Sequence, residues 1–218
     1  LDTFNMMPTD LEKRISKKTK AVIFIDALGN PSEILKIKEI CEKNNIILIE
    51  DAACAFGSSV GGIKCGNIAD ITCFSFHPRK VLTTGEGGAI TTNSWGLARF
   101  FEVKLNHGAV TQGSKLDFID YGYNFRLSEI QAALGVKQLK KIDAIVKSRQ
   151  AIKEEYRKCL EPHGFKAQRH DKNVVHNMQS VVFKTPKNID RDDLIEHLRK
   201  HGIEATIGTY CLSNTTYY

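Results

Sequence analysis

The sequence predicts an α/β domain built on a parallel sheet, followed by a smaller α+β unit. The apolar runs AVIFI (21–25) and IILIE (46–50) are typical of buried strands, and SEILKIKEICEKNN (32–45) between them has helical spacing. A strand, a helix and a second strand joined by short turns form the right-handed crossover of a parallel sheet. From about residue 145 the pattern changes, so we expect one domain over 1–144 and another over 145–218.

The remaining elements follow from the same patterns in chain order. The first domain begins with a helix, adds two strands and a helix after the crossover, and ends in a long helical pattern. We expect that pattern to break or bend near Gly135 or Ile142. The predicted ranges are 9–18 (helix), 70–76 and 89–93 (strands), 97–106 (helix), 127–160 (helical pattern), 174–186 (strand), 190–202 (helix) and 202–208 (strand).

Composition argues against several classes of function. The 218 residues carry a net charge of +6 without a basic block interleaved with aromatics, so we expect no nucleic-acid partner. The six cysteines form no C-x-x-C pair, which favours reduced thiols in a cytoplasmic protein, and no apolar run reaches membrane-spanning length. No grouping of His, Cys and carboxylates has metal-ligand spacing, so no metal site is expected. The chain starts at Leu1 without an initiator Met, and both ends look cut.

Polar side chains gather where two predicted strands end. Asp51 ends one strand, Ser75 and His77 end another, and Lys80 follows just before the glycine cluster GEGG. In open parallel sheets, ligands bind beyond the carboxyl ends of the strands. Each residue alone has an ordinary explanation, because strand-end Asp often caps a helix, loop lysines are usually solvated and GEGG is usually a turn. Their joint arrangement is more specific, because one cofactor uses all of these groups.

That cofactor is pyridoxal 5'-phosphate (PLP). Its aldehyde needs a lysine amine, its ring nitrogen needs an acidic partner and its phosphate needs hydroxyl and amide donors, which Lys80, Asp51 and Ser75 supply. With a usual pKa near 10.4, only about one lysine in a few thousand is neutral at pH 7, a barrier of roughly 4 to 5 kcal/mol. Burial and a nearby cation such as Arg79 lower that barrier. We therefore expect Lys80 in a partly closed pocket, with His77 as a further candidate contact.

At these residues the sequence resembles a known family. EDAACAFGS (50–58) and DITCFSFHPRKVLTTGEGGAITTN (70–93) are similar to the active-site core of the DegT/DnrJ/StrS family of PLP-dependent sugar aminotransferases. LNHG, YGYNFRLSEIQAALG, HNMQSVVF and HGIEATIGTYCL follow in the family's order, so the resemblance covers essentially the whole chain. It implies the PLP-dependent transferase fold type I, with a mixed, mostly parallel sheet, helices on both faces and a small C-terminal α+β domain.

The resemblance also implies roles for individual residues. Lys80 would bind the cofactor aldehyde and move the proton, Asp51 would pair with the pyridinium nitrogen and Ser75 would bind the phosphate. Asn124 would reach into a neighbouring subunit and contact its phosphate, which implies a homodimer with shared active sites. Cys54 stands where the family commonly has Gln or His against the cofactor ring, so the position of the ring is open.

A second departure concerns the length of the chain. The family has an earlier segment with a Gly-Ser/Thr phosphate-binding turn and an aromatic residue that stacks on the ring, and this sequence does not contain it. We therefore expect a fragment that holds the later part of the cofactor domain and most of the small domain. Such a fragment would contain only part of the site.

The expected activity is transfer of an amino group from glutamate or glutamine to a keto sugar, nucleotide-linked, in amino-sugar or polysaccharide biosynthesis. Two alternatives remain open: a PLP-dependent sugar dehydratase and a non-catalytic regulatory or binding protein of the same fold. Lys80 argues against the dehydratase, in which the resemblance implies histidine at that position. A plain nucleotide-binding module would need a glycine-rich turn directly after the first strand, and none is present. The sugar, the nucleotide and the aminated ring position are not determined by the sequence.

Overall fold

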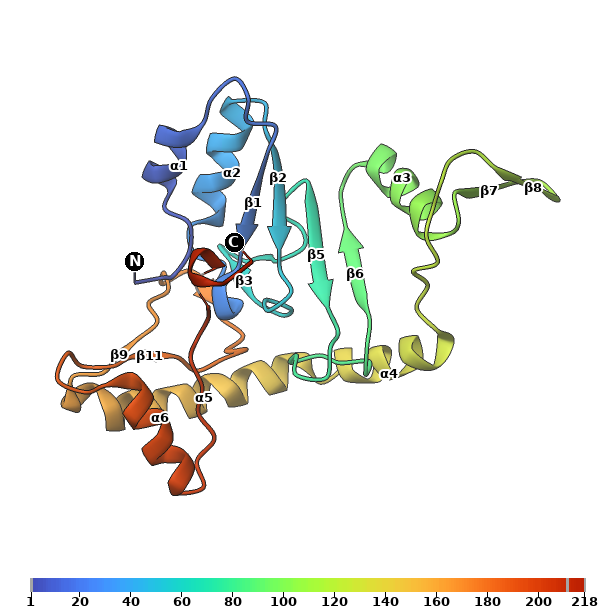
Figure 1. Ribbon diagram of the computed structural model, residues 1–218. Coiled ribbons are helices and arrows are strands. Elements are labelled where there is room, and N and C mark those ends of the chain that lie inside the picture. The colour runs from blue at the N-terminus through green and yellow to red at the C-terminus, as the bar shows by residue number, and fades with distance from the viewer. Residues whose placement is uncertain (1, 211, 218) are drawn as a thin grey trace.

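The computed structural model describes residues 2–210 and 212–217. Its centre is a four-stranded sheet with the order β1-β2-β5-β6 (Figure 1). Strand β1 (Ala21–Ile25) is parallel to β2 (Ile47–Asp51), which is parallel to β5 (Ile71–Ser75). Strand β6 (Gly88–Thr91) is antiparallel to β5. The predicted mixed, mostly parallel sheet is confirmed.

The other elements surround this sheet or follow it. The helices are α1 (Pro8–Arg14), α2 (Ile34–Lys43), α3 (Trp95–Leu105), α4 (Glu129–Leu139), α5 (Ile142–Leu160) and α6 (Arg191–Lys200). Short 3-10 turns are η1 (Ala27–Gly29), η2 (Glu161–His163) and η3 (Leu212–Asn214). The minor strands are β3 (Ser59–Val60), β4 (Ile63–Lys64), β7 (Ala109–Gln112), β8 (Lys115–Phe118), β9 (Lys166–Ala167), β10 (Val174–Val175) and β11 (Phe183–Lys184).

The two faces of the sheet differ in burial. Helices α1 and α2 pack on one face, where Phe24 and Leu48 are fully buried with Ile34 and Ile37 of α2. Residues of opposite parity point to the other face, because side chains alternate along a strand. On that face the isoleucines of β1 and the first residue of β2 are exposed: Ile23 is 59%, Ile25 58% and Ile47 46% accessible. We call this second surface the open face of the sheet.

The long helical pattern forms two helices, α4 and α5, which cross beneath the carboxyl ends of β2 and β5 (Figure 1). The break falls at Lys140 and Lys141, next to Ile142, so the second of the two expected positions is confirmed. Helix α4 begins with a capping box between Ser128 and Gln131, which satisfies backbone donors that a helix start leaves free. Residues 76–87, which connect β5 to β6 and carry Lys80, form what we call the lysine loop. Gly135 lies inside α4, where an added Cβ would approach Thr84 of this loop to 3.1 Å.

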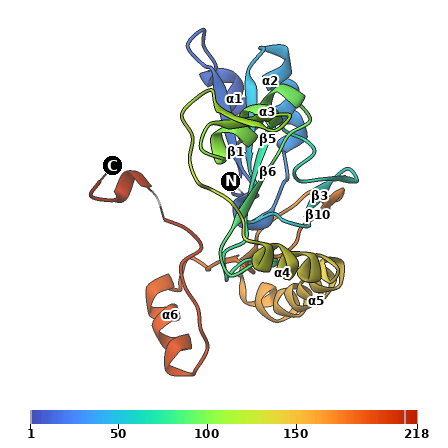
Figure 2. The ribbon, with the colours of Figure 1, turned by 90° about the vertical axis from the view of Figure 1, so that its right-hand side faces the viewer.

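The boundary predicted between residues 144 and 145 falls inside α5, which continues unbroken across it. The division into 1–144 and 145–218 therefore stays a proposal. Strands β3 and β10 pair antiparallel, so residues near 60 and 174 also connect the two regions. Figure 2 shows α6 and the segment after it standing apart from the sheet.

The strand predicted over 202–208 is wrong. In the structure this segment is irregular, and Ile203 N–H donates back to the Leu198 carbonyl at the end of α6. A β-strand requires a neighbouring strand, and β11 and β9 pair only with each other among the described residues. Along the described helices, none is both long and apolar enough to span a membrane.

Candidate active site

Asp51 and Ser75 lie on the same face at the ends of adjacent strands. Asp51 is in register with Cys73, and Ser75 lies two residues beyond Cys73, so all three side chains point to the open face. Ile25 of β1 is also in register with Asp51. Asp51 is half-buried, and its Oδ1 accepts a hydrogen bond from Ala53 N–H at 3.1 Å. Its other oxygen has no hydrogen-bond partner in the described part of the chain.

Lys80 and Cys54 meet directly. Lys80 closes a turn after β5, in which its N–H donates to the His77 carbonyl at 2.9 Å. Its Nζ donates to Cys54 Sγ at 3.2 Å, and both residues are half-buried. Cys54 follows Asp51 by three residues, so this contact brings the lysine loop against the loop that leaves β2. The structure thus places two of the predicted residues side by side in a partly closed setting.

The segment between Ser75 and Lys80 is a tight local turn. Ser75 Oγ accepts from His77 N–H over a long 3.4 Å, which leaves the Ser75 hydroxyl proton available to another acceptor. His77 Nδ1 accepts from Arg79 N–H at 3.2 Å, so the His77 ring is held by its own turn. The predicted contact of His77 with cofactor or substrate has no test here and stays a prediction.

The glycine cluster returns the chain from the lysine loop to β6. A Cβ at Gly88 would lie 2.7 Å from the Phe74 carbonyl oxygen, and Gly87 has a φ of +145°. Thr84 Oγ1 donates to the Glu86 carbonyl at 2.7 Å and fixes the turn between them. The positive φ therefore accounts for the glycine at 87, and close approach of the Phe74 backbone accounts for the glycine at 88.

Asn124 lies apart from the other predicted residues. It is exposed, forms an isolated backbone bridge with Asn106, and its Oδ1 accepts from Arg126 Nε at 2.8 Å. Within the described residues it makes no hydrogen bond to Asp51, Ser75 or Lys80. The structure therefore brings together Lys80 with Cys54 and Asp51 with Ser75, but not Asn124 with either pair.

Comparison with known proteins identifies the chain's relatives. The sequence profile of the DegT/DnrJ/EryC1/StrS aminotransferase family matches residues 1–218. The chain belongs to this family. A GDP-perosamine synthase of Escherichia coli O157:H7 is 34% identical over 204 residues, which cover 93% of this chain and 55% of that protein. The chain thus spans about half the length of the curated relatives that it matches.

Solved structures of family members agree with the fold. Helicobacter pylori PseC, an aminotransferase involved in the biosynthesis of pseudoaminic acid, superimposes with a TM-score of 0.94 at 27% identity, over 100% of this chain and 60% of that one. The Streptococcus pneumoniae sugar aminotransferase Spr1654, described as putative, superimposes in its PLP form with a TM-score of 0.91 at 26% identity, over 100% of this chain and 61% of that one. It is also known in a PMP form. The fold type expected from the sequence is confirmed.

One relative bears on the dehydratase alternative. A dTDP-4-dehydro-2,6-dideoxy-D-glucose 3-dehydratase of Saccharopolyspora spinosa is 31% identical over 173 residues, which cover 68% of this chain and 37% of that protein. The chain therefore has relatives named for either reaction, and the assignment between them depends on the residues of the site.

Behind the open face of this family member lies a buried acidic cluster that the sequence reasoning missed. One carboxylate oxygen each of Asp26 and Glu50 and the sulfur of Cys65 lie within 4.8 Å of one another. Glu50 Oε2 accepts from Thr72 Oγ1 at 2.7 Å and from Gly66 N–H at 3.0 Å, whereas Glu50 Oε1 and both Asp26 oxygens find no donor among the described residues. The sequence did contain a signal for this cluster, because Asp26 directly follows the run that forms β1, and β1 is the neighbour of β2, which carries Glu50.

Burial and the nearby Glu50 carboxylate raise the pKa of Asp26 well above its usual range, and burial raises the pKa of the Cys65 thiol. The raised pKa of Asp26 favours its protonated form, and one proton between the two carboxyls would remove the repulsion of two buried charges. A metal ion at this cluster would have to displace the protons of Asp26 and Cys65. The expected absence of a metal stays a prediction.

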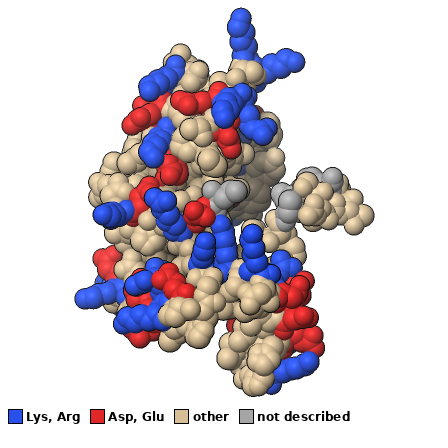
Figure 3. Space-filling model, turned by 90° about the vertical axis from the view of Figure 1, so that its left-hand side faces the viewer, with Lys and Arg blue, Asp and Glu red and all other residues tan. Residues whose placement is uncertain are grey.

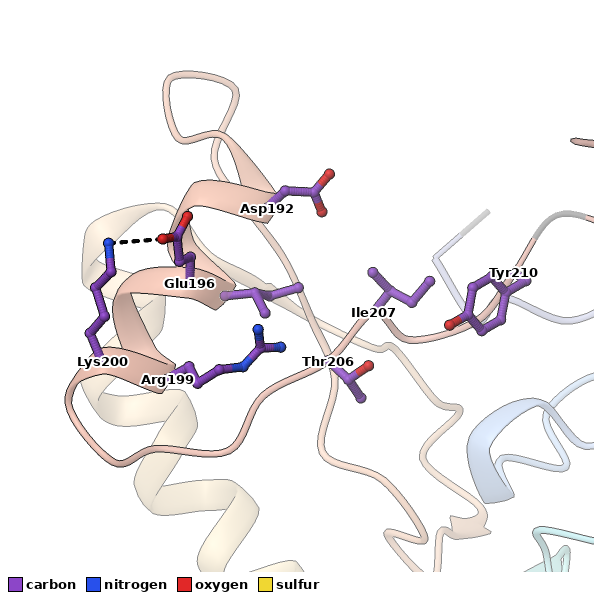
Figure 4. Close-up of a pocket in the computed structure, with 8 residues that line it drawn as sticks. Asp192, Glu196, Arg199, Lys200, Thr206, Ile207 and Tyr210 are labelled. Carbon is purple, nitrogen blue, oxygen red and sulfur yellow. Dashed lines mark ion pairs between the residues drawn. The ribbon is translucent and has the colours of Figure 1, made fainter.

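A surface hollow elsewhere does not coincide with the site. A cavity of about 570 Å³ lies between α6 and residues 206–210, with Arg199, Thr206, Ile207 and Tyr210 along it (Figure 4). Lys200 and Glu196 form an ion pair at its edge, with Nζ and Oε1 2.8 Å apart. None of the predicted cofactor residues borders this hollow, so it is not the candidate active site.

Proposed function

We propose that the protein is a PLP-dependent aminotransferase that transfers an amino group from an amino acid to a keto sugar, carried on a nucleotide. The single observation that carries the proposal is the contact of Lys80 Nζ with Cys54 Sγ, 3.2 Å, beyond the strands that hold Asp51 and Ser75. Relatives named GDP-perosamine synthase and UDP-4-amino-4,6-dideoxy-N-acetyl-beta-L-altrosamine transaminase support a nucleotide-linked substrate. Because the chain spans 55% of the first of these, the proposal concerns the whole protein.

The residues present fit the chemistry of PLP. Asp51 offers a carboxylate oxygen without a partner among the described residues, Ser75 offers a hydroxyl proton and Lys80 offers an amine, all half-buried. PLP, when bound, withdraws electrons from the carbon attached to the transferred nitrogen. In this proposal Asp51 keeps a proton at the ring nitrogen by its negative charge, and Ser75 donates a hydrogen bond to the phosphate.

Lys80 has two tasks in the proposed reaction. When PLP is bound, the amine would hold its aldehyde between turnovers, and once released it would move a proton to or from the substrate carbon that bears the transferred nitrogen. Cys54 contacts the amine and packs where the ring would lie, in place of a larger side chain. The thiol is a weak hydrogen-bond partner, so it constrains the lysine less than an amide or imidazole would.

A second subunit completes the proposed site. Asn124 is exposed and lies in a segment with many exposed apolar side chains, including Phe118 (64%), Tyr121 (70%), Phe125 (66%) and Ile130 (85%). Exposed apolar patches of this kind mark association surfaces. We propose a homodimer in which Asn124 binds the phosphate at the partner's site. Glutamate or glutamine as donor and a cytoplasmic location belong to the same proposal.

No partner other than a second copy and small molecules is proposed. Basic side chains gather near the middle of the face shown in Figure 3, with acidic side chains beside them. Such mixing does not form the continuous basic surface typical of nucleic-acid binding. The absence of nucleic-acid and membrane partners stays a prediction.

The absorbance spectrum of the protein with added PLP tests the proposal. Wild-type protein should gain the visible band of a lysine-bound cofactor and lose it when an amino donor is added. Lys80→Ala should lack the band, and its rate should fall at least about 1000-fold, because the lysine both binds the cofactor and moves the proton. Lys187→Ala, an exposed lysine on the other unit, is the matched control and should behave as wild type.

The same preparation separates the two alternatives. Transfer of a labelled nitrogen from the donor to the sugar identifies an aminotransferase, whereas loss of a sugar hydroxyl without nitrogen transfer identifies a dehydratase. A spectrum unaltered by PLP, or a band that survives Lys80→Ala, would favour a non-catalytic binding protein.

A further inference from the structure

Residues 176–179 (HNMQ) form a strap that lies between α5 and the loops of the candidate active site. Met178 adopts a left-handed backbone, with a φ of 53°, which turns the strap back on itself. Arg149 of α5 donates to the Met178 carbonyl from Nε at 2.7 Å and to the Gln179 carbonyl from Nη2 at 3.0 Å. Gln150 Nε2 donates to the His176 carbonyl at 2.9 Å. The backbone of the strap is thus fixed to α5.

The side chain of Asn177 fixes the loop that carries Cys54. Asn177 is fully buried, and its Nδ2 donates to the Cys54 carbonyl at 2.8 Å and to the Phe56 carbonyl at 2.9 Å. Its Oδ1 accepts from Gln179 N–H at 2.8 Å, so both ends of the amide are used. These bonds join residues more than 100 positions apart in the chain, and they set where Cys54 meets Lys80.

The side chain of Gln179 fixes the lysine loop itself. Its Oε1 accepts from Val81 N–H at 3.1 Å, and its Nε2 donates to the Arg79 carbonyl at 2.8 Å. These two backbone groups stand immediately before and after Lys80. One amide therefore holds both flanks of the residue, as a neighbouring strand would hold it.

We propose that Gln179 is a positioning residue for Lys80, and that the strap connects α5 to the lysine. The turn through His77 holds only the amino-terminal side of Lys80, whereas Gln179 reaches both sides. Misplacement of a reacting group by about 1 Å can lower a rate about a hundredfold. The effect on catalysis rests on the proposed function, but the positioning of the loop does not.

The test compares Gln179, which lies in the strap and binds the lysine loop, with Gln150, which lies on α5 and binds the strap. Gln179→Met removes both bonds to the lysine loop at similar side-chain volume, and Gln150→Met removes a bond that reaches only the strap. The first measurement is amide hydrogen exchange at Val81 without cofactor, together with the acylation rate of the Lys80 amine. The second measurement, on cofactor-loaded protein, is kcat and KM for the amino donor and the keto sugar.

Gln179→Met should speed exchange at Val81 by about fivefold to tenfold, the factor that corresponds to one lost hydrogen bond. It should change the acylation rate of Lys80 and lower kcat about tenfold with little change in KM. Gln150→Met should leave all of these values within about twofold of wild type. Equal effects of the two variants, or unaltered exchange at Val81 in Gln179→Met, would overturn the proposal.

A second variant covers the case in which Gln179→Met does not fold. Gln179→Glu keeps an acceptor for Val81 N–H but cannot donate to the Arg79 carbonyl, so exchange at Val81 should stay slow while Lys80 acylation changes. Fast exchange at Val81 in this variant would also overturn the proposal. Because exchange and acylation need no cofactor, a failure of the aminotransferase proposal would leave this test readable.

Discussion

Glu50 and Asp51 are consecutive acids on the same strand, and they lie on opposite faces of the sheet. Glu50 is fully buried and holds Thr72 and Gly66, while Asp51 is half-buried on the open face and keeps one oxygen free of the described residues. The same chemical group is thus structural at one position and available to a ligand at the next. Strand alternation alone produces this difference, because neighbouring side chains on a strand point in opposite directions.

The comparison extends to the rest of each face. On the buried face, Thr72 is bonded to Glu50, and burial beside Glu50 raises the pKa of Asp26, whose oxygens find no donor among the described residues. On the open face, the Ser75 hydroxyl and the Asp51 carboxylate retain unused bonding capacity beside exposed Ile23 and Ile25. Thr72 and Asp26 are fully buried, so of these two pairs only Ser75 and Asp51 present polar groups that a ligand can reach.

Substitution of the two acids should separate stability from activity, and this is the largest effect that we expect from the difference between the two faces. Asp51→Asn should lower activity about a hundredfold or more, since it removes the charge proposed to hold the ring proton, and it should change the unfolding free energy by less than about 1 kcal/mol. Glu50→Ala should lower the unfolding free energy by roughly 3 kcal/mol, because it leaves Thr72 and Gly66 N–H unsatisfied around a cavity. Urea unfolding and initial rates measure both quantities.

The comparison would fail if the two outcomes were exchanged. A strongly destabilised Asp51→Asn, or a fully stable Glu50→Ala, would mean that the faces are not divided as described. Thr92→Val, which removes a hydrogen bond to the Asp70 carbonyl away from both acids, provides a control for ordinary hydrogen-bond loss.

Asp26→Asn should change how stability depends on pH. The pKa of Asp26 is raised on folding above its usual value near 4. At any pH between these two pKa values, the folded state therefore holds a proton that the unfolded state has lost. Stability from this group is therefore fully present below about pH 4 and is lost as pH rises through the folded pKa, by up to about 1.4 kcal/mol per pH unit.

The amide that Asp26→Asn introduces cannot ionise and offers an N–H to Glu50, so the variant should lack this slope. Its unfolding free energy relative to wild type, measured by denaturant titrations at several pH values, should increase as the pH rises from about 4 towards the raised pKa of Asp26. An identical pH dependence in the two proteins would show that no proton is held between Asp26 and Glu50.

Cys54→Ala should have the smallest effect. The thiol is half-buried and contacts the amine of Lys80 over 3.2 Å, so its removal should leave the melting temperature within a few degrees of wild type. Activity should fall by about twofold to threefold, because a thiol is a weak hydrogen-bond acceptor. A much larger loss at constant stability would assign Cys54 a stronger part in orienting Lys80 than its chemistry indicates.

The strands and the strand-end residues were predictable because their signals are local. Apolar runs predict β1 and β2, and the rule that ligands bind beyond the carboxyl ends of strands indicates Asp51 and Ser75 from the sequence alone. Lys80 and Cys54 were predicted as site residues from motifs that lie in one continuous stretch of 31 residues, 50–80. The strand expected over 202–208 failed because its composition was suitable but the described chain supplies no strand beside it.

The sequence by itself determined which residues form most of the strands and helices, the family to which the chain belongs and the chemical groups that it can offer to PLP. The tertiary structure decided which of these groups are saturated and which remain free. It joined Asp26 to Glu50 across the sheet, and it brought Gln179 to both flanks of Lys80 from about a hundred residues away. Such contacts depend on strand register and on the docking of distant segments, and neither leaves a periodic pattern that the chain can show on its own.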